Sequence, residues 1–180
     1  KEAEASEPND PNAMAIASVD KDGMPSVRIV LLKQWSQDGF IFFTNYTGRK
    51  SQELITTKKA AACLHWKSLR RQVRIVGNVD KISPSMSSAY FATRARGSQI
   101  GAWASNQSQP LNTRAELRLN VAEYEKRFAG QTVVRPKHWG GFIIKPVEIE
   151  FWADGAYRLH DRFQLKKDAE GTWKSTRLNP

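Results

Sequence analysis

Tight turns between short apolar segments are the feature that most restricts the fold of this chain. Met14 to Val19 runs into Asp22-Gly23, a dipeptide typical of hairpin turns, and the apolar segment Ser26 to Lys33 follows. A second turn at Gln37-Asp38-Gly39 precedes another apolar segment, Phe40 to Thr44. Connections this short join antiparallel strands, because a parallel pair needs a crossover of about a dozen residues or more. This part of the chain therefore predicts an antiparallel meander.

The remaining sequence predicts more strands with a few helices between them. Further strands are expected over Ala60 to Trp66, Arg71 to Ile82, Phe142 to Ile144, Ile149 to Phe163 and Thr172 to Leu178, and helices over Gly48 to Lys59, from Ser83-Pro84, and from Thr113 to about Phe128. Gly77 indicates a bulge or a close approach of ligand. About eight short strands favour a closed or nearly closed antiparallel barrel, because closure removes exposed strand edges. The predicted fold is mainly β with inserted helices.

Composition narrows the possible partners. The chain has 180 residues, which predicts one domain over 1–180, and its formal net charge of +10 attracts anions. Nucleic acid is one candidate, but the charges are spread without a basic tail or zinc-ligand spacing, and a phosphate-bearing small molecule needs only a few of them. No apolar run approaches the roughly 18 residues of a membrane span. The lone Cys63 fits a reducing compartment, so a cytoplasmic protein is expected.

Three basic or potentially basic residues alternate near the end of the chain. If Ile149 to Phe163 is a strand, Arg158, His160 and Arg162 share one face. Such a row repels itself unless an anion or polar ligand lies against it. By composition alone, the solvated face of an antiparallel strand is the favoured interpretation.

Two further groups could bind phosphate. Gly48-Arg49-Lys50 begins a predicted helix, where basic residues oppose the dipole but, together with backbone N–H groups, form a good phosphate cradle. Tyr90 and Arg94 are four residues apart on the next helix, and Ser98 lies just past its end. Two hydroxyls and a guanidinium converge there, as a phosphate site requires.

These motifs, in order along the chain, resemble the pyridoxine/pyridoxamine 5'-phosphate oxidase family, flavoenzymes that make pyridoxal 5'-phosphate. The matching segments are Arg28-Ile29-Val30-Leu31-Leu32-Lys33, Gly48-Arg49-Lys50, Arg71-Gln72-Val73, Ser98-Gln99-Ile100-Gly101-Ala102-Trp103, and a C-terminal signature of Glu150, Phe151, Trp152, Arg158, His160 and Arg162. Ala153 departs from the usual Gln, His or Gly, at a spacer position. The resemblance covers essentially the whole chain and implies a flavin mononucleotide (FMN)-binding split β-barrel. Residues 1–10 would then be the mobile remnant of a longer N-terminal arm.

The resemblance also implies a set of site residues. For FMN they are Arg28, Ile29, Phe43, Thr44, Arg49, Lys50, Gln72, Gln107, Ser108, Trp152 and Arg162. The substrate phosphate falls on Lys33, Tyr90, Arg94 and Ser98, while Arg158 and His160 lie near the substrate ring as the catalytic pair. Arg28 and Lys33 are five residues apart, hence on opposite faces of an ideal strand, which fits two different anions.

The implied reaction is oxidation of pyridoxine 5'-phosphate or pyridoxamine 5'-phosphate. A hydride moves from C4' to flavin N5, and O2 then reoxidises the flavin and yields hydrogen peroxide. The flavin supplies the redox chemistry, and the protein supplies orientation and charge. The family resemblance further implies a homodimer with FMN at the subunit interface.

Three other interpretations remain open. A related split-barrel oxidase could act on another aromatic substrate, as in dihydrophenazine oxidation. The chain could instead be a basic nucleic-acid-binding barrel, or a flavin-binding module without turnover. No metal site is expected, because His65 and His138 lack a partner pattern.

Overall fold

The computed structural model describes residues 1–180. All nine strands belong to one sheet in the order β2-β1-β5-β6-β7-β4-β3, with β8 next to β7 and β9 next to β8. The strands are β1 (Ala13–Val19), β2 (Pro25–Leu31), β3 (Gln34–Ser36), β4 (Gly39–Asn45), β5 (Lys59–Trp66), β6 (Arg71–Lys81), β7 (Trp139–Ala153), β8 (Asp161–Lys167) and β9 (Trp173–Leu178). The helices are α1 (Glu2–Ser6), α2 (Arg49–Thr57), α3 (Pro84–Ala92), α4 (Arg96–Ala104), α5 (Arg114–Arg127) and the short 3-10 helix η1 (Ala156–Arg158).

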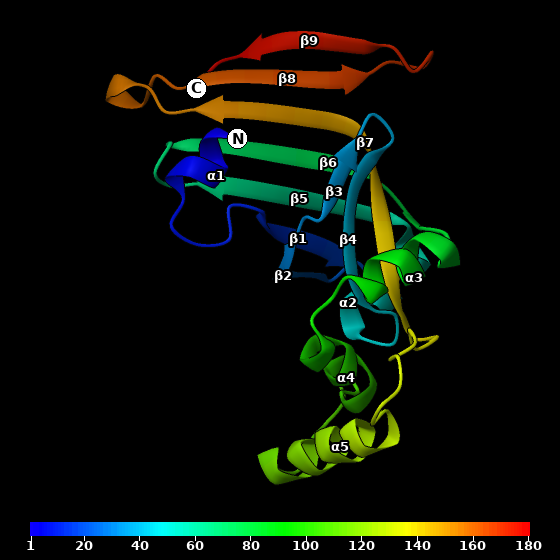
Figure 1. The fold of residues 1–180 in the computed structure, drawn as a ribbon. Helices are drawn as coiled ribbons and strands as arrows, with labels where there is room; N and C mark the ends of the chain where they lie inside the picture. Colours follow the sequence, from blue (N-terminus) through cyan, green and yellow to red (C-terminus); the bar gives the residue numbers. More distant parts are fainter.

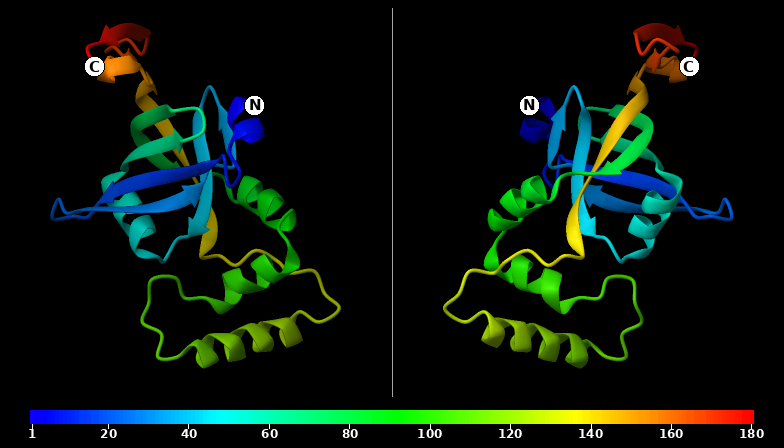
Figure 2. Two further views of the ribbon diagram at one scale, coloured as in Figure 1. Left: turned by 90° about the vertical axis from the view of Figure 1, so that its left-hand side faces the viewer. Right: turned by 90° about the vertical axis from the view of Figure 1, so that its right-hand side faces the viewer.

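The long strand β7 organises this sheet (Figure 1). Its first residues pair with β4 and its last residues with β8, while β6 runs along its other edge. Every strand pair is antiparallel, as the tight turns predict. The sheet curls on itself, and the β8–β9 hairpin stands away from the curled part (Figure 2). The predicted split barrel with inserted helices is therefore the observed architecture.

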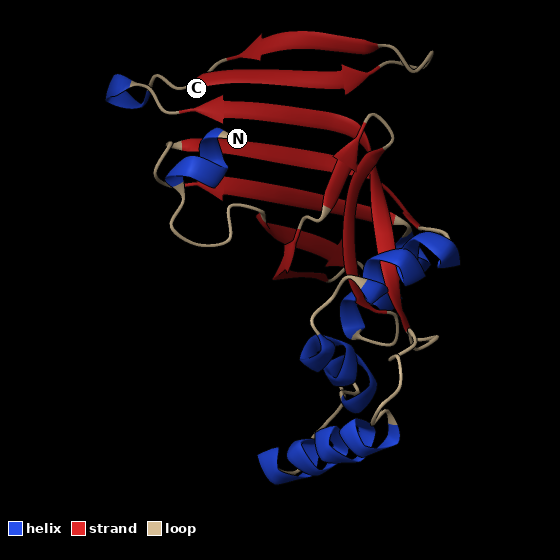
Figure 3. Ribbon diagram, in the orientation of Figure 1, coloured by secondary structure: helices blue, strands red, loops and turns tan.

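Two apolar clusters hold the fold together. The larger fills the curled sheet and includes Met14, Phe42 and Ile75. The smaller joins α3, α4 and the start of β7 through Phe91, Ile100 and Trp139, among others. Helices α3, α4 and α5 gather at the end of the molecule away from β8 and β9 (Figure 3). The two clusters thus stabilise the sheet and the helical end separately.

Local signals in the sequence form as expected. The Ser83 hydroxyl accepts a hydrogen bond from the Met86 N–H at 3.2 Å and caps α3. The sheet register shifts at Gly77, where an added Cβ would lie 2.3 Å from the Lys145 carbonyl oxygen. Gly77 is therefore the predicted bulge, and the close approach is made by the β7 backbone rather than by a ligand.

The prediction of one strand from Ile149 to Phe163 is wrong. Strand β7 ends at Ala153, and a loop containing η1 precedes β8. Tyr157 and Arg158 have positive φ angles of 56° and 63°. An added Cβ on Gly155 would lie 2.1 Å from the Leu159 carbonyl oxygen, so this loop closes tightly on itself. Consequently Arg158, His160 and Arg162 do not share a strand face.

Three smaller differences concern element bounds. The sheet has a ninth strand, β3, that the sequence pattern did not indicate. Helix α3 ends at Ala92, so Arg94 lies beyond it and not on its face, while Ser98 lies inside α4.

No helix of the structure is both long enough and apolar enough to cross a membrane.

Candidate functional site

A cavity of about 960 Å³ lies where β2, β4, α2 and the segment from α3 to Ser108 meet. Of its twenty lining residues, five are Lys or Arg and none is Asp or Glu. Twelve residues predicted from the sequence line it: Arg28, Ile29, Lys33, Phe43, Thr44, Arg49, Lys50, Tyr90, Arg94, Ser98, Gln107 and Ser108. We call these twelve residues the cavity group. A basic cavity without a lining acid is suited to an anionic ligand.

Lys33 is placed differently from the expectation. Strand β2 ends at Leu31, so the alternation of a strand does not extend to Lys33. Arg28 and Lys33 consequently line the same cavity, not opposite faces of a sheet.

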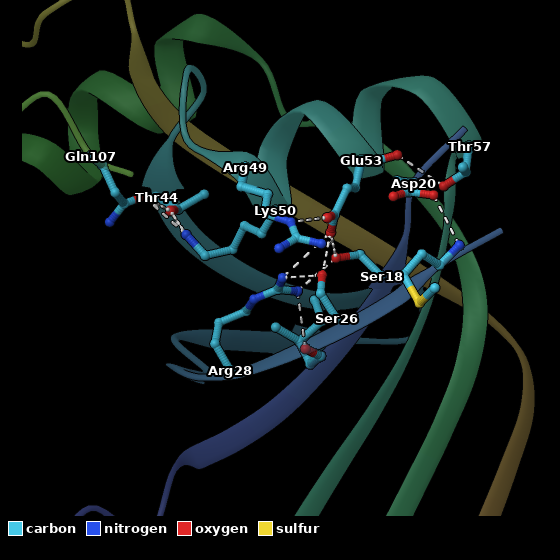
Figure 4. A network of polar contacts seen from close by, with 12 residues as sticks. Ser18, Asp20, Ser26, Arg28, Thr44, Arg49, Lys50, Glu53, Thr57 and Gln107 are labelled. Atoms are coloured by element: carbon cyan, nitrogen blue, oxygen red, sulfur yellow. Dashed lines mark hydrogen bonds and ion pairs between the residues drawn. The ribbon is translucent and has the colours of Figure 1, made fainter. Parts of the chain in front are cut away.

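Lys50 is held by neutral oxygen atoms. Its Nζ donates to Thr44 Oγ1 and, at 3.0 Å, to Gln107 Oε1 (Figure 4). Burial, followed by the charge of Arg28, lowers the pKa of Lys50 to about 8. The side chain is thus fixed at the cavity wall without a carboxylate to neutralise it.

Glu53, which does not line the cavity, holds the two neighbouring arginines. Its Oε2 accepts from Ser18 Oγ at 2.5 Å, Ser26 Oγ at 2.6 Å and Arg28 Nη2 at 3.4 Å, and its Oε1 accepts from Arg49 Nε at 2.8 Å. Burial raises the pKa of this carboxyl, but the hydrogen bonds and the Arg28 charge outweigh burial and lower the pKa to about 2. Sequence reasoning missed Glu53, because its partners come from β1, β2 and α2 with no shared motif.

Arg94 has an unsatisfied donor. Its Nη1 atom is buried and has no hydrogen-bond partner. The guanidinium carbon lies 4.6 Å from the centre of the Trp139 ring, and burial lowers the pKa of Arg94. Phe43 and Tyr90 stack beside it with ring centres 3.8 Å apart. Because a buried donor without an acceptor costs about 1–3 kcal/mol, the geometry favours a ligand oxygen at this point.

The other five predicted residues do not line this cavity. Gln72 pairs with Trp152 across β6 and β7, and Trp152 pairs with Arg162 across β7 and β8. The His160 ring centre lies 4.6 Å from that of Trp152, and Arg158 is exposed in η1. We call these five residues the β7–β8 group. Within one chain, the predicted site is therefore divided between two places.

Carboxylates lie against two residues of the β7–β8 group, Arg162 and His160. Arg162 donates to Glu150 through Nε at 3.0 Å and Nη2 at 3.1 Å, and these hydrogen bonds raise the pKa of Arg162. The Gly155 N–H donates to His160 Nδ1 at 3.2 Å, and Asp154 Oδ1 lies 3.3 Å from the same nitrogen. The imidazole is thus oriented from its Nδ1 side, which leaves Nε2 for a ligand.

Solved structures define the class of protein first. The structure of an FMN-binding protein from Nostoc punctiforme, described as pyridoxamine 5'-phosphate oxidase-related, superposes with a TM-score of 0.76 at 14% identity, covering 94% of this chain and 88% of that one. PhzG from Burkholderia lata 383, in complex with tetrahydrophenazine-1-carboxylic acid, superposes with a TM-score of 0.92 at 31% identity, covering 99% of this chain and 86% of that one. The fold is the split barrel of flavin-binding oxidases.

Sequence comparisons then give the family. The family described as pyridoxamine 5'-phosphate oxidase matches residues 1–128, and the pyridoxine 5'-phosphate oxidase C-terminal dimerisation region matches residues 139–180. Pyridoxine/pyridoxamine 5'-phosphate oxidase of Rhizobium etli is 56% identical over 181 residues, covering 100% of this chain and 88% of the relative. The Brucella anthropi protein of the same name is 54% identical over 180 residues, covering 99% and 89%. The chain belongs to the pyridoxamine 5'-phosphate oxidase family, which confirms the resemblance seen in its motifs.

Proposed function

We propose that this protein oxidises pyridoxine 5'-phosphate or pyridoxamine 5'-phosphate to pyridoxal 5'-phosphate, with FMN as cofactor and O2 as electron acceptor. The observation that carries the proposal is the cavity with five cationic side chains and no lining acid. Both the cofactor and the substrate in this reaction carry a phosphate. Membership of the family supports the same chemistry.

The residues around Lys50 fit the flavin phosphate. Lys50 has no acidic partner, and Arg49 uses only its Nε in the bond to Glu53, so its terminal nitrogens remain for a ligand. Thr44 and Gln107 would add neutral polar contacts next to Lys50. When bound, FMN supplies the acceptor for the hydride that leaves substrate C4', and O2 takes up the electrons as hydrogen peroxide.

The residues around Arg94 fit the substrate phosphate. The unpartnered Nη1 of Arg94 would donate to a phosphate oxygen, with Tyr90, Ser98 and Lys33 lining the same cavity. Because Nη1 is already buried, this atom loses little hydration when the anion arrives. This group would therefore fix the substrate and direct its ring toward the flavin.

His160 would orient the substrate. Because the Gly155 N–H donates to Nδ1 at 3.2 Å, the proton of the neutral ring lies on Nε2. Nε2 would therefore donate a hydrogen bond to the substrate hydroxyl or amine and hold C4' in place as the hydride leaves. Arg158, exposed in η1, would lie over the substrate ring and position it.

A homodimer would bring the two groups together. The β7–β8 group lies within, or pairs with, the region that matches the family's C-terminal dimerisation region. We infer that FMN binds at the subunit interface, between the cavity group of one subunit and the β7–β8 group of its partner. The division of the predicted site within one chain supports this arrangement.

The first test is a visible spectrum of the protein reconstituted with FMN under anaerobic conditions. Adding pyridoxine 5'-phosphate should bleach the flavin band near ~450 nm, and air should restore it with formation of pyridoxal 5'-phosphate. Flavin that binds but does not bleach would contradict the substrate assignment. No binding of FMN would contradict the cofactor assignment.

A second candidate function comes from the likeness to PhzG, whose structure contains tetrahydrophenazine-1-carboxylic acid. That ligand carries a carboxylate, which Arg94 could also bind. The same spectrum distinguishes the two functions. Faster bleaching by a dihydrophenazine carboxylate than by pyridoxine 5'-phosphate would favour the second function.

A further inference from the structure

Glu53 is a buried carboxylate that neither lines the cavity nor belongs to the predicted site. It lies in α2 with 5% of its surface exposed. Four side chains donate to it, and two of them, Arg28 and Arg49, line the cavity. A buried ionised carboxylate is expensive to maintain unless its hydrogen bonds are complete, as they are here.

The two serines connect Glu53 to Arg28 in addition to the direct ion pair. Ser18 donates to Glu53 and accepts from Arg28 Nη1 at 2.6 Å. Ser26 donates to Glu53 and accepts from Arg28 Nη2. Both terminal nitrogens of Arg28 are therefore held within the protein, Nη1 by Ser18 and by the Ile16 carbonyl at 3.3 Å, and Nη2 by Ser26 and Glu53 (Figure 4). The Nε donor and the positive charge of Arg28 remain for the phosphate.

The other oxygen of the carboxylate orients Arg49. Because Glu53 accepts only from Nε, the terminal nitrogens of Arg49 are left to bind a ligand. The bond joins residues four apart in α2, so the helix itself sets the position of the guanidinium. Without the carboxylate, the Arg49 side chain, which is 61% exposed, would lose this contact.

Charge gives a second reason for a carboxylate at this point. Arg28, Arg49 and Lys50 carry three positive charges close together, and Glu53 reduces the sum to two. A phosphate monoester carries about −1.5 to −2 charges at neutral pH. The cluster therefore complements a phosphate in charge, and the repulsion among its cations is reduced before the ligand binds.

We propose that Glu53 is the positioning residue of the flavin-phosphate subsite, holding Arg28 and Arg49 in the orientation that binds the phosphate. This inference rests on the proposed function, since FMN is the ligand. A positioning role and simple charge repulsion predict opposite effects of replacing Glu53 on FMN affinity. Removal of a negative charge near an anion should strengthen binding by charge alone, whereas loss of a positioning residue should weaken it.

The test compares FMN with riboflavin, which lacks the phosphate. Flavin fluorescence titrations would give both affinities for wild type, for Glu53→Gln, and for the control Asp80→Asn, which removes an exposed carboxylate paired with Lys145. Glu53→Gln should weaken FMN binding roughly tenfold or more and change riboflavin binding less than about twofold, because only charge-assisted bonds to phosphate are lost. Asp80→Asn should change neither affinity.

Other outcomes of this titration overturn the proposal. Equal weakening of FMN and riboflavin would mean that Glu53 only supports the fold. Unchanged or tighter FMN binding would mean that it positions nothing. A wild-type protein that does not prefer FMN over riboflavin would instead contradict the proposed function, and the positioning role with it.

A milder variant covers the case in which Glu53→Gln does not fold. Ser18→Ala combined with Ser26→Ala removes the two hydroxyls between Arg28 and the carboxylate but leaves the ionised Glu53 in place. We expect a smaller loss, about threefold to tenfold, again for FMN and not for riboflavin, because Arg49 keeps its bond. An unchanged FMN-to-riboflavin ratio in a folded double variant would overturn the proposal.

Discussion

The two parts of the predicted site differ in how much of their positive charge is neutralised by carboxylates. The cavity group has five cationic side chains, and its lining has no carboxylate. In the β7–β8 group, Arg162 is matched by Glu150, and His160 lies against Asp154. In the first, Glu53 behind the lining offsets only one of five positive charges, whereas in the second each of Arg162 and His160 lies against a carboxylate and only Arg158 has none. This difference fits the proposal that the cavity group provides charge and the β7–β8 group provides orientation.

The same contrast appears in the pKa values. Burial and the nearby Arg28 lower the pKa of Lys50 to about 8, because no acid stabilises its charged form. Hydrogen bonds to Glu150 raise the pKa of Arg162. Each shift follows from the partner that the fold provides, not from the residue type.

The largest effect should come from the β7–β8 group. Replacing His160 with Ala should slow flavin reduction by about 10²-fold, because it removes the Nε2–H donor that would orient the substrate hydroxyl or amine, while FMN still binds. Stopped-flow reduction of the FMN-loaded enzyme by saturating pyridoxine 5'-phosphate measures this rate. His65→Ala, at an exposed position of β5, is the control. If flavin in His160→Ala were reduced at the wild-type rate, the proposed role of His160 would be wrong, and with it the orienting role of the β7–β8 group.

An intermediate effect is expected in the cavity group. Arg94→Ala should weaken apparent substrate affinity by about tenfold to a hundredfold, because a charge-assisted hydrogen bond to phosphate is lost. The bound flavin should be retained. Steady-state KM, with flavin content measured in the same samples, checks both statements.

Arg118→Ala, an exposed arginine of α5, serves as the control for this variant. An unchanged KM in Arg94→Ala would show that the unpartnered Nη1 atom is not the phosphate donor. If Arg94→Ala lost bound flavin as well as substrate affinity, the flavin phosphate and the substrate phosphate would not have separate subsites.

The smallest effect is a pH dependence of FMN binding. Lys50 loses its proton as pH rises through about 8, so FMN affinity should fall above that pH, with a slope approaching tenfold per pH unit at most. The sign follows because the protonated amine binds the phosphate and the neutral amine does not. Lys50→Arg keeps its charge at these pH values and should flatten the profile. An equally steep profile in Lys50→Arg would assign the titration to another group.

Much of the fold could be predicted because its signals are local. The hairpin at Asp22-Gly23 joins β1 to β2, and Ser83 caps α3, as their residue types require. These features depend on a few neighbouring residues. Of the twelve residues of the cavity group, Arg49, Lys50, Tyr90, Arg94 and Ser98 were indicated by pattern, and the other seven by family resemblance.

The failures concern the residues at which strands end. Alternation predicted a strand through Arg158 and His160, but Gly155 packs against the Leu159 carbonyl and the chain turns there. Lys33 joined Arg28 in one cavity because β2 ends two residues before Lys33. The alternation of side chains along a strand shows which residues share a face, but not the residue at which the strand ends.

The sequence by itself determined the turns, the helix caps, the antiparallel pairing of neighbouring strands and the family. Only the tertiary structure decided which charges meet. Glu53 acquires its role because β1, β2 and α2 bring Ser18, Ser26 and Arg28 to one carboxylate. The energy of that cluster depends on burial and on distances between residues far apart in the chain, and no local sequence pattern encodes either quantity.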